Sequence, residues 1–187
     1  MNFIPQSISD VLLIEPTVHS DDRGYFIETF RQDLLEDAIG YKVNFVQDNE
    51  SKSTKGVIRG LHYQLTPYTQ AKLVRVIDGS VLDISVDIRK SSPTFGQHVS
   101  IELTAQSKYQ LFIPRGFAHG FVALTDTATF SYKVDNYYSN KHESGISFDD
   151  KQLNINWGLP YELLQISDKD SQLPSLDKIK KTYLIKK

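Results

Sequence analysis

Hydrophobic and polar positions alternate with a period of two in many short stretches of this chain. In VLDISVDI, residues 81–88, the odd positions hold a valine, two aspartates and a serine, while every even position is aliphatic. Glycine, proline, asparagine, aspartate or serine separates most of these stretches, and DGSV at 78–81 is typical of a tight hairpin turn. Strands are predicted over residues 11–18, 24–30, 42–48, 57–65, 72–79, 81–88, 98–103, 109–114, 120–125 and 128–138.

Helical spacing is confined to short segments. RQDLLEDAI at 31–39 has this spacing, and Gly40 is a suitable residue to end such a helix. Beyond about residue 160, PYELLQ and SLDKIKK are helix-like, and no second set of strands follows them. Many closely spaced strands with few helices predict an all-β barrel or sandwich of jelly-roll type with a few short peripheral helices. We expect one domain over residues 1–187, a C-terminal helical appendix from about residue 160, and a site formed by inward polar residues at the open mouth of the barrel.

Composition and charge exclude several classes of protein. The chain has 187 residues, of which 40% are hydrophobic and 24% charged, which is typical of a globular protein. A net charge of −2 does not indicate a nucleic-acid binder, and no apolar run approaches the roughly 20 residues that cross a bilayer. The first residues lack the features of a signal peptide, so we expect a cytoplasmic protein. Without cysteine, disulfides, thiolate zinc sites and cysteine nucleophiles are excluded.

Two of the five histidines lie in apolar strand context. His62 is part of GLHYQL, and His119 is part of IPRGFAHGFVAL. A histidine in such a context is more often structural than functional. A metal site in a small β-barrel needs three or four converging ligands and usually begins with a His-x-His pair, but Gln64 occupies the second position of that pair. We therefore expect neither a metal nor another cofactor.

Proton transfer is the other chemistry open to His62. A neutral imidazole serves as a general base when a carboxylate or carbonyl fixes its tautomer, and local spacing does not choose among the available carboxylates. A site that abstracts protons also needs a cation beside the oxygen that gains charge. Lys72 is a candidate for this cation, although a solvated strand end is the plainer interpretation. The candidate carboxylates are Asp83, Asp87, Asp168 and Asp170.

Further polar and aromatic residues gather in two other regions. Tyr132 and Tyr138 are six residues apart, so a regular strand would place both on one face, either as a proton donor and a stacking ring or as core aromatics. Arg23 and Arg59 could bind phosphate oxygens, and an inward-facing Glu28 would need a partner.

The order of several motifs resembles that of the dTDP-4-dehydrorhamnose 3,5-epimerases. These motifs are DDRGYFIETF, FVQDNESKS, VIRGLHYQ, AKLVRVIDG, IPRGFAHGF, the Tyr132–Tyr138 segment and ISDKD, and the match runs from about residue 3 to residue 176. The resemblance implies a cupin-type jelly roll, a homodimer and catalysis without a metal or cofactor. It also implies conversion of dTDP-4-dehydro-6-deoxy-D-glucose to dTDP-4-dehydro-L-rhamnose by inversion at C3 and C5, in dTDP-L-rhamnose biosynthesis.

The resemblance also implies roles for individual residues. His62 matches the base that removes the C3 and C5 protons, and Asp170 matches the carboxylate paired with it. Tyr132 matches the acid that returns a proton on the opposite face, and Lys72 matches the cation beside the C4 oxygen. Tyr138 matches the residue that stacks on thymine. The other positions that match substrate contacts are Arg23, Glu28, Gln47, Asp48, Asn49, Arg59, His119, Glu143 and Lys169.

Two questions stay open at this level. Arg59 and His62 are three residues apart, so a regular strand would turn them to opposite faces, unless Gly60 allows a bulge or Arg59 serves another edge of the site. The resemblance also implies that the first motif, DDRGYFIETF, reaches the neighbouring subunit's site. The alternative functions are a 3- or 5-mono-epimerase of a related nucleotide sugar, a non-catalytic sugar-binding cupin and, weakened by Gln64, a metal-dependent cupin oxygenase.

Overall fold

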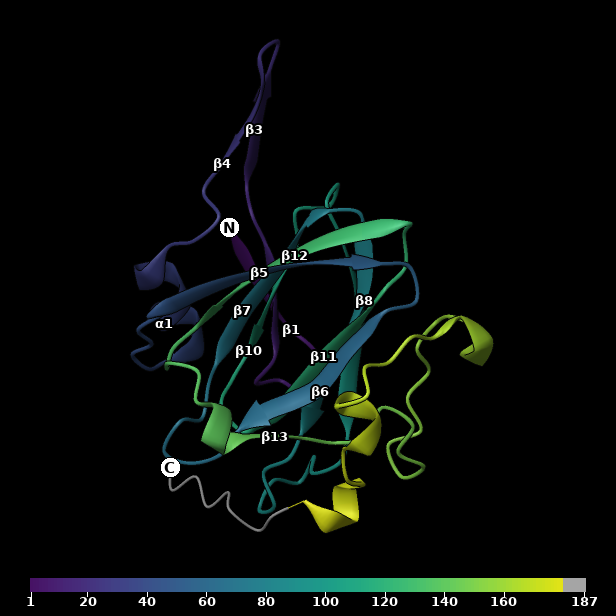
Figure 1. Ribbon diagram of the computed structural model, residues 1–187. Coiled ribbons are helices and arrows are strands. Elements are labelled where there is room, and N and C mark those ends of the chain that lie inside the picture. Colours follow the sequence, from purple (N-terminus) through teal and green to yellow (C-terminus); the bar gives the residue numbers. More distant parts are fainter. Residues whose placement is uncertain (180–187) are drawn as a thin grey trace.

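Two antiparallel β-sheets pack face to face in the computed structural model, which describes residues 1–179 (Figure 1). The six-stranded sheet has the order β1 (Asn2–Pro5), β2 (Leu12–Glu15), β10 (Gln110–Ile113), β7 (Lys72–Asp78), β12 (Thr127–Val134) and β5 (Gln47–Thr54). The five-stranded sheet has the order β13 (Glu143–Gly145), β6 (Ile58–Gln64), β11 (Phe117–Ala123), β8 (Ser80–Asp87) and β9 (His98–Thr104). The predicted all-β jelly-roll class is confirmed.

A third, two-stranded element projects from this body. Strands β3 (Val18–Asp21) and β4 (Gly24–Ile27) form a hairpin that extends well away from both sheets (Figure 1). Tyr25 and Phe26 on this hairpin are 58% and 66% exposed, which is unusual for large aromatic side chains.

The apolar face of β8 is turned away from the space between the two sheets. Its even-numbered aliphatic residues, such as Ile84, lie on the outer face of the five-stranded sheet. There they pack against the C-terminal segment 146–179, which contributes Trp157 and Leu176 to the same cluster. Its odd-numbered face, with Asp83 and Ser85, therefore points toward the space between the sheets, where Val81 joins the central core. Both faces are buried, and the polar face is the one that reaches the interior of the barrel.

Two sequence-based expectations need correction, and a third is confirmed. The turn at 78–81 is present, with Gly79 at φ 75°, but it does not form a hairpin because β7 and β8 belong to different sheets. The strand predicted over 42–48 begins only at Gln47 and continues through polar residues to Thr54. The helix predicted at 31–39 is confirmed as α1 (Gln32–Ile39), with Gly40 at φ 78° directly after it.

The C-terminal segment contains short 3₁₀ turns where helical pieces were expected. These turns are η2 (Tyr161–Leu163), η3 (Asp170–Gln172) and η4 (Leu176–Lys178), after η1 (Asn140–His142) earlier in the chain. Gln165 exchanges backbone hydrogen bonds with Gly56 and Ile58 beside the start of β6, so PYELLQ pairs with a strand and cannot continue as a helix. The end of SLDKIKK, residues 180–181, lies outside the described residues.

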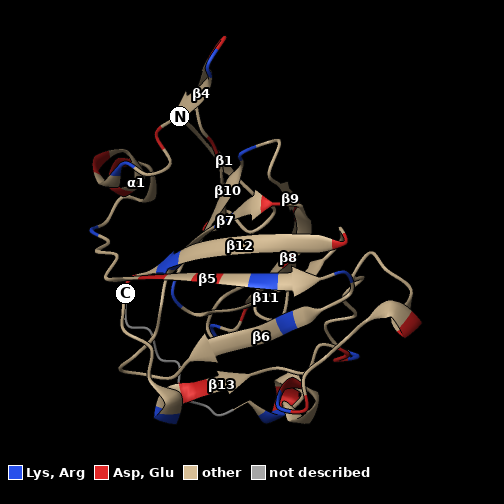
Figure 2. Cartoon of the chain, turned by 45° about the horizontal axis from the view of Figure 1, so that its top comes forward, with Lys and Arg blue, Asp and Glu red and all other residues tan. Residues whose placement is uncertain are grey.

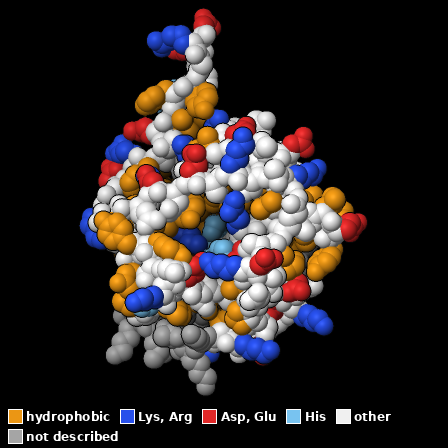
Figure 3. All heavy atoms as spheres, viewed as in Figure 1, with side chains coloured by type: hydrophobic (Ala, Val, Ile, Leu, Met, Phe, Trp, Pro, Cys, Tyr) orange, Lys and Arg blue, Asp and Glu red, His pale blue; other side chains and the backbone are white. Residues whose placement is uncertain are grey.

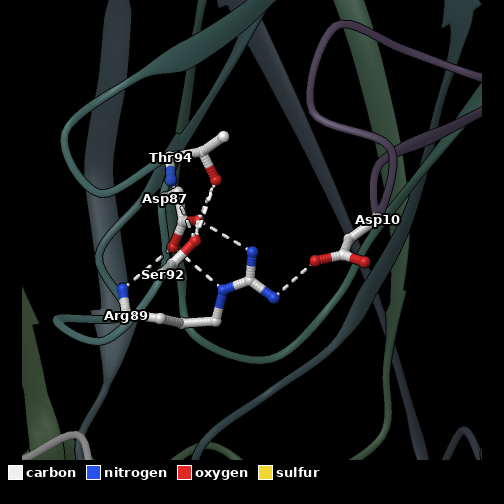
Figure 4. A network of polar contacts seen from close by, with 5 residues as sticks. All are labelled: Asp10, Asp87, Arg89, Ser92 and Thr94. Atoms are coloured by element: carbon white, nitrogen blue, oxygen red, sulfur yellow. Dashed lines mark hydrogen bonds and ion pairs between the residues drawn. The ribbon is translucent and has the colours of Figure 1, made fainter.

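A buried ion pair closes the loop after β8 (Figure 4). Asp87 accepts hydrogen bonds from the Arg89 guanidinium and from the hydroxyls of Ser92 and Thr94, while Arg89 also reaches Asp10 at 2.6 Å. Because all these donors to Asp87 come from residues 89–94 of the loop itself, this network has a structural role.

Within residues 1–179, no helix is long and apolar enough to cross a membrane.

Candidate active site

A cavity of about 320 Å³ opens between the two sheets. Figure 3 looks into this hollow, with histidine atoms at its floor and basic and acidic side chains around its rim. Charged positions lie on β5, β6 and β13 (Figure 2), and Glu50, Arg59 and Glu143 of these strands line the cavity. The lining residues are Asn49, Glu50, Ser51, Arg59, His62, Tyr63, Gln64, Gln70, Lys72, His119, Phe121, Phe130, Tyr132, Tyr138, Glu143 and Asp170.

His62 on β6 is paired with Asp170 at the start of η3. The His62 Nε2 atom lies 2.7 Å from Asp170 Oδ1, and the Gly60 N–H points at the second carboxylate oxygen from 3.5 Å. Burial acts to raise the pKa of Asp170, but the hydrogen bond and charge of His62, with the Gly60 N–H, outweigh it and lower this pKa overall. Asp170 is therefore ionised at neutral pH and can fix the tautomer of His62.

A β-bulge brings Arg59 and His62 to the same cavity. Along the pairing of β11 with β6, His119 faces His62 and Phe121 faces Arg59, so three steps on β6 oppose two on β11. A Cβ atom at Gly60 would lie 2.5 Å from the Cα of Gly120, so this close approach requires glycine. Of the two alternatives left open for Arg59, the structure shows the bulge at Gly60.

Lys72, His119 and Asp83 form a second polar chain behind the first pair. The Lys72 Nζ atom lies 3.5 Å from His119 Nδ1, and His119 Nε2 lies 2.8 Å from Asp83 Oδ2. Burial is the main cause that lowers the pKa of Lys72, to about 8, against the opposing charges of Asp83 and Glu143. Burial likewise lowers the pKa of His119, which is consequently neutral at pH 7.

Tyr132 and Tyr138 both line the cavity, but for a reason other than strand alternation. Strand β12 ends at Val134, so Tyr138 lies in the following loop, where its hydroxyl donates to Glu143 Oε2 at 2.6 Å. Lys169 contacts the other oxygen of Glu143 at 2.6 Å. Burial is the main cause that raises the pKa of Tyr132, so this phenol keeps its proton at neutral pH.

Several residues predicted for the site lie away from the cavity of this chain. Arg23 at the tip of the hairpin has a side chain 90% exposed and pairs with Asp21, and Glu28 is 56% exposed and 3.7 Å from Arg31. Asp48 is on the other face of β5, where Lys133 donates to it at 2.9 Å.

Gln47 and Lys169 lie at the edge of the site. Gln47 accepts the Tyr138 N–H at 3.1 Å and donates to Asn49, so it supports two lining residues. The lining residues that were not predicted as site residues include Ser51, Gln70 and the ring of Phe121. Ser51 is two residues after Asn49, and the period of two would have identified it had β5 been recognised.

A larger cavity, of about 870 Å³, lies beside α1 and contains none of the predicted site residues. Its two arginines are already paired, Arg115 with Asp135 and Arg89 with Asp87 and Asp10. Within residues 1–179, no group of three or more His, Asp or Glu side chains is arranged to hold a metal ion. The arrangement of the smaller cavity is suited to proton transfer at a carbon beside a polarised carbonyl.

Comparisons with known proteins agree with this chemistry. A family model described as dTDP-4-dehydrorhamnose 3,5-epimerase matches residues 5–178. The dTDP-4-dehydrorhamnose 3,5-epimerase of Shigella flexneri is 58% identical over 170 residues, covering 91% of this chain and 93% of that protein. The crystal structure of the dTDP-4-dehydrorhamnose 3,5-epimerase from Elizabethkingia anophelis superposes with a TM-score of 0.93 at 45% identity, over 98% of this chain and 99% of that one.

A structure with a bound sugar nucleotide is similarly close. The dTDP-6-deoxy-D-glucose-3,5-epimerase of Legionella pneumophila, in complex with dTDP-4-keto-L-rhamnose, has a TM-score of 0.92 at 46% identity, over 96% of this chain and 94% of that one. These likenesses confirm the predicted cupin-type jelly roll.

Proposed function

Because the chain belongs to the dTDP-4-dehydrorhamnose 3,5-epimerase family, we propose that its central cavity converts dTDP-4-dehydro-6-deoxy-D-glucose to dTDP-4-dehydro-L-rhamnose, in dTDP-L-rhamnose biosynthesis. The observation that carries the proposal is the presence of a base, an acid and a cation in one cavity: the His62–Asp170 pair, Tyr132 and Lys72.

The proposed mechanism follows from the acidity of protons beside the C4 ketone. His62 removes the proton at C3 or C5, and the electron pair left on carbon delocalises onto the C4 oxygen as an enolate. The Lys72 ammonium stabilises that oxygen, and Asp170 stabilises the imidazolium that forms on His62. Tyr132 then donates its proton to the opposite face of the carbon, which inverts the centre. Positioned acid–base groups of this kind typically contribute about 10²–10⁴-fold each.

Substrate binding would use the groups around this centre. Arg59 supplies a guanidinium for the diphosphate, and Tyr138 supplies an exposed ring for the thymine. The remaining proposed contacts are Gln47, Asn49, His119, Glu143 and Lys169, while Asp48 would require a different orientation of β5 or of its own side chain.

A second copy of the chain is the proposed partner. The projecting hairpin (Figure 1) exposes Tyr25 and Phe26 and carries Arg23 at its tip, and none of the three lines the cavity of its own chain. A homodimer in which each hairpin reaches the other subunit's site would bury these aromatics and bring Arg23 and Glu28 to a substrate. Sedimentation equilibrium should then give twice the chain mass. A cytoplasmic location remains a prediction.

The test is solvent exchange. In D₂O with dTDP-4-dehydro-6-deoxy-D-glucose, the protein should introduce deuterium at both C3 and C5. Deuterium at one carbon alone would instead indicate a mono-epimerase, and binding without any exchange would indicate a non-catalytic sugar-binding protein. His62→Ala should abolish exchange at both carbons, whereas the control His98→Asn, on β9 and outside the cavity lining, should leave it intact.

A further inference from the structure

Asp83 is a buried carboxylate for which the proposed mechanism has no role. It is fully buried on the inward face of β8, and its Oδ2 atom contacts His119 at 2.8 Å. Its Oδ1 atom has no hydrogen-bond partner among residues 1–179. An ionised carboxylate with a single donor is costly to bury unless a cation lies close enough to compensate it.

That cation is Lys72, and His119 lies between the two charges. His119 Nε2 faces Asp83, and His119 Nδ1 faces the Lys72 Nζ atom at 3.5 Å. A neutral imidazole has one N–H and one lone pair. When Nε2 donates its N–H to Asp83, the lone pair of Nδ1 is directed at the lysine and accepts an N–H from it.

Few other groups hold the Lys72 ammonium. Its second contact is the backbone oxygen of His62, also at 3.5 Å, so among residues 1–179 a third N–H is left for a substrate oxygen. The titratable groups that face it come from β12, which pairs with β7, and from four strands of the facing sheet. They are Tyr132 on β12, Asp83 on β8, His119 on β11, His62 on β6 and Glu143 on β13.

The charge balance around Lys72 makes Asp83 important. Burial disfavours the ammonium, and the carboxylate of Asp83 is the larger of the two charges that oppose this effect, ahead of Glu143. Glu143 is already engaged by Lys169 and Tyr138. Asp83 is thus the carboxylate most available to keep the ammonium charged.

We propose that Asp83 is a positioning residue for the epimerisation: acting through a single tautomer of His119, it keeps Lys72 charged and directed at the oxygen that becomes the enolate. This inference rests on the proposed function. It assigns different tasks to the two histidine–carboxylate pairs. His119–Asp83 keeps Lys72 charged, whereas His62–Asp170 moves a proton.

The test is the pH dependence of turnover in Asp83→Asn. Asparagine has nearly the same shape, so it removes the charge without leaving a cavity. The alkaline limb of the kcat profile should move to lower pH by about one unit, at the lower end of the 1–3 units typical of a nearby opposite charge. At a pH above the alkaline limbs of both proteins, the rate of Asp83→Asn should be about tenfold below that of wild type. The affinity for dTDP should be unchanged, because the charge acts at the sugar carbonyl.

Ser85→Ala is the matched control, because Ser85 is also fully buried on the inward face of β8 but carries no charge. It should leave the alkaline limb in place. A direct readout comes from NMR of lysines labelled at Cε, with the Lys72 resonance assigned by its loss in Lys72→Arg. This resonance should titrate at lower pH in Asp83→Asn than in wild type.

His119→Gln interrupts the series of contacts from Lys72 through His119 to Asp83, and it replaces Asp83→Asn in the test if that variant does not fold. It should shift the alkaline limb of the kcat profile and the titration of Lys72 in the same direction. The inference is overturned if a folded variant keeps the wild-type limb and the wild-type Lys72 titration. Failure of the proposed function is a separate result, because the wild-type protein would then show no solvent exchange at all.

Discussion

Gly60→Ala tests whether the bulge between β6 and β11 shapes the active site. Gly60 has φ 134°, which side-chain-bearing residues rarely adopt. A Cβ atom there would also lie 2.5 Å from the Cα of Gly120 and 2.9 Å from the carbonyl oxygen of His119. Both obstacles are backbone atoms of the neighbouring strand, so they cannot be relieved by a rotamer change.

The two effects can be sized separately. A residue held in such a backbone region costs about 1–3 kcal/mol, and overpacking a closely packed contact adds about 1–3 kcal/mol. Gly60→Ala should therefore lower the free energy of unfolding by about 4 kcal/mol. Gly24→Ala is a matched control, because Gly24 has a similar φ of 127° but no neighbouring atom within 4 Å of the added Cβ. The control should lose only the backbone part, about 1–3 kcal/mol.

Urea unfolding at a fixed protein concentration measures both variants, and the turnover number measures the site. Gly60→Ala should also lose most activity, since its backbone N–H faces Asp170 and its bulge turns Arg59 toward His62. Equal destabilisation by the two substitutions would show that the contact with Gly120 contributes nothing. Wild-type turnover in a folded Gly60→Ala would refute the link between the bulge and the chemistry.

Two further predictions concern an acid and a buried ion pair. Tyr132→Phe should slow product formation more than the first deuterium exchange, and equal losses in both assays would count against its role as the proton donor. Asp87→Asn should lower the free energy of unfolding at pH 7 by about 2–3 kcal/mol. Burial acts to raise the pKa of Asp87, but bonds from Arg89, Ser92 and Thr94 lower it overall, so its contribution is present above pH 4 and lost as the pH falls. The difference between wild type and Asp87→Asn should therefore shrink in urea titrations at pH 3, and a constant difference would contradict this assignment.

The sequence predicted the strands whose side chains differ between the two faces. It missed most of β5, because QDNESKST is polar on both faces and this strand depends on its pairing with β12. It predicted a hairpin at DGSV because local turn chemistry is the same whether the next strand returns to the same sheet or crosses to another. The crossing is determined by β8 pairing with β9 and β11, which lie farther along the chain.

Loop residues were harder to place than strand residues. Tyr138 shares the cavity with Tyr132 through a loop held by Gln47 and Glu143, so the argument from strand alternation was wrong, and the stacking role of Tyr138 stays a prediction. Arg23 and Glu28 were expected at the site, and in a single chain they are on or beside the projecting hairpin. No pattern within one chain can indicate whether such a hairpin acts within its own chain or on a second copy.

The choice of carboxylate for each histidine illustrates the same limit and explains the role of the C-terminal segment. His62 and His119 face each other across β6 and β11. β11 is flanked by β8, so His119 reaches Asp83 on that strand. β6 is one strand farther from β8, and on its other neighbour, β13, the residue opposite His62 is Gly145, so the carboxylate for His62 comes from outside the sheet. The segment expected to be a peripheral appendix supplies it as Asp170, 108 residues from His62, while its apolar residues cover the outer face of the same sheet. The packing that stabilises this segment is therefore also what holds the carboxylate against the proposed base.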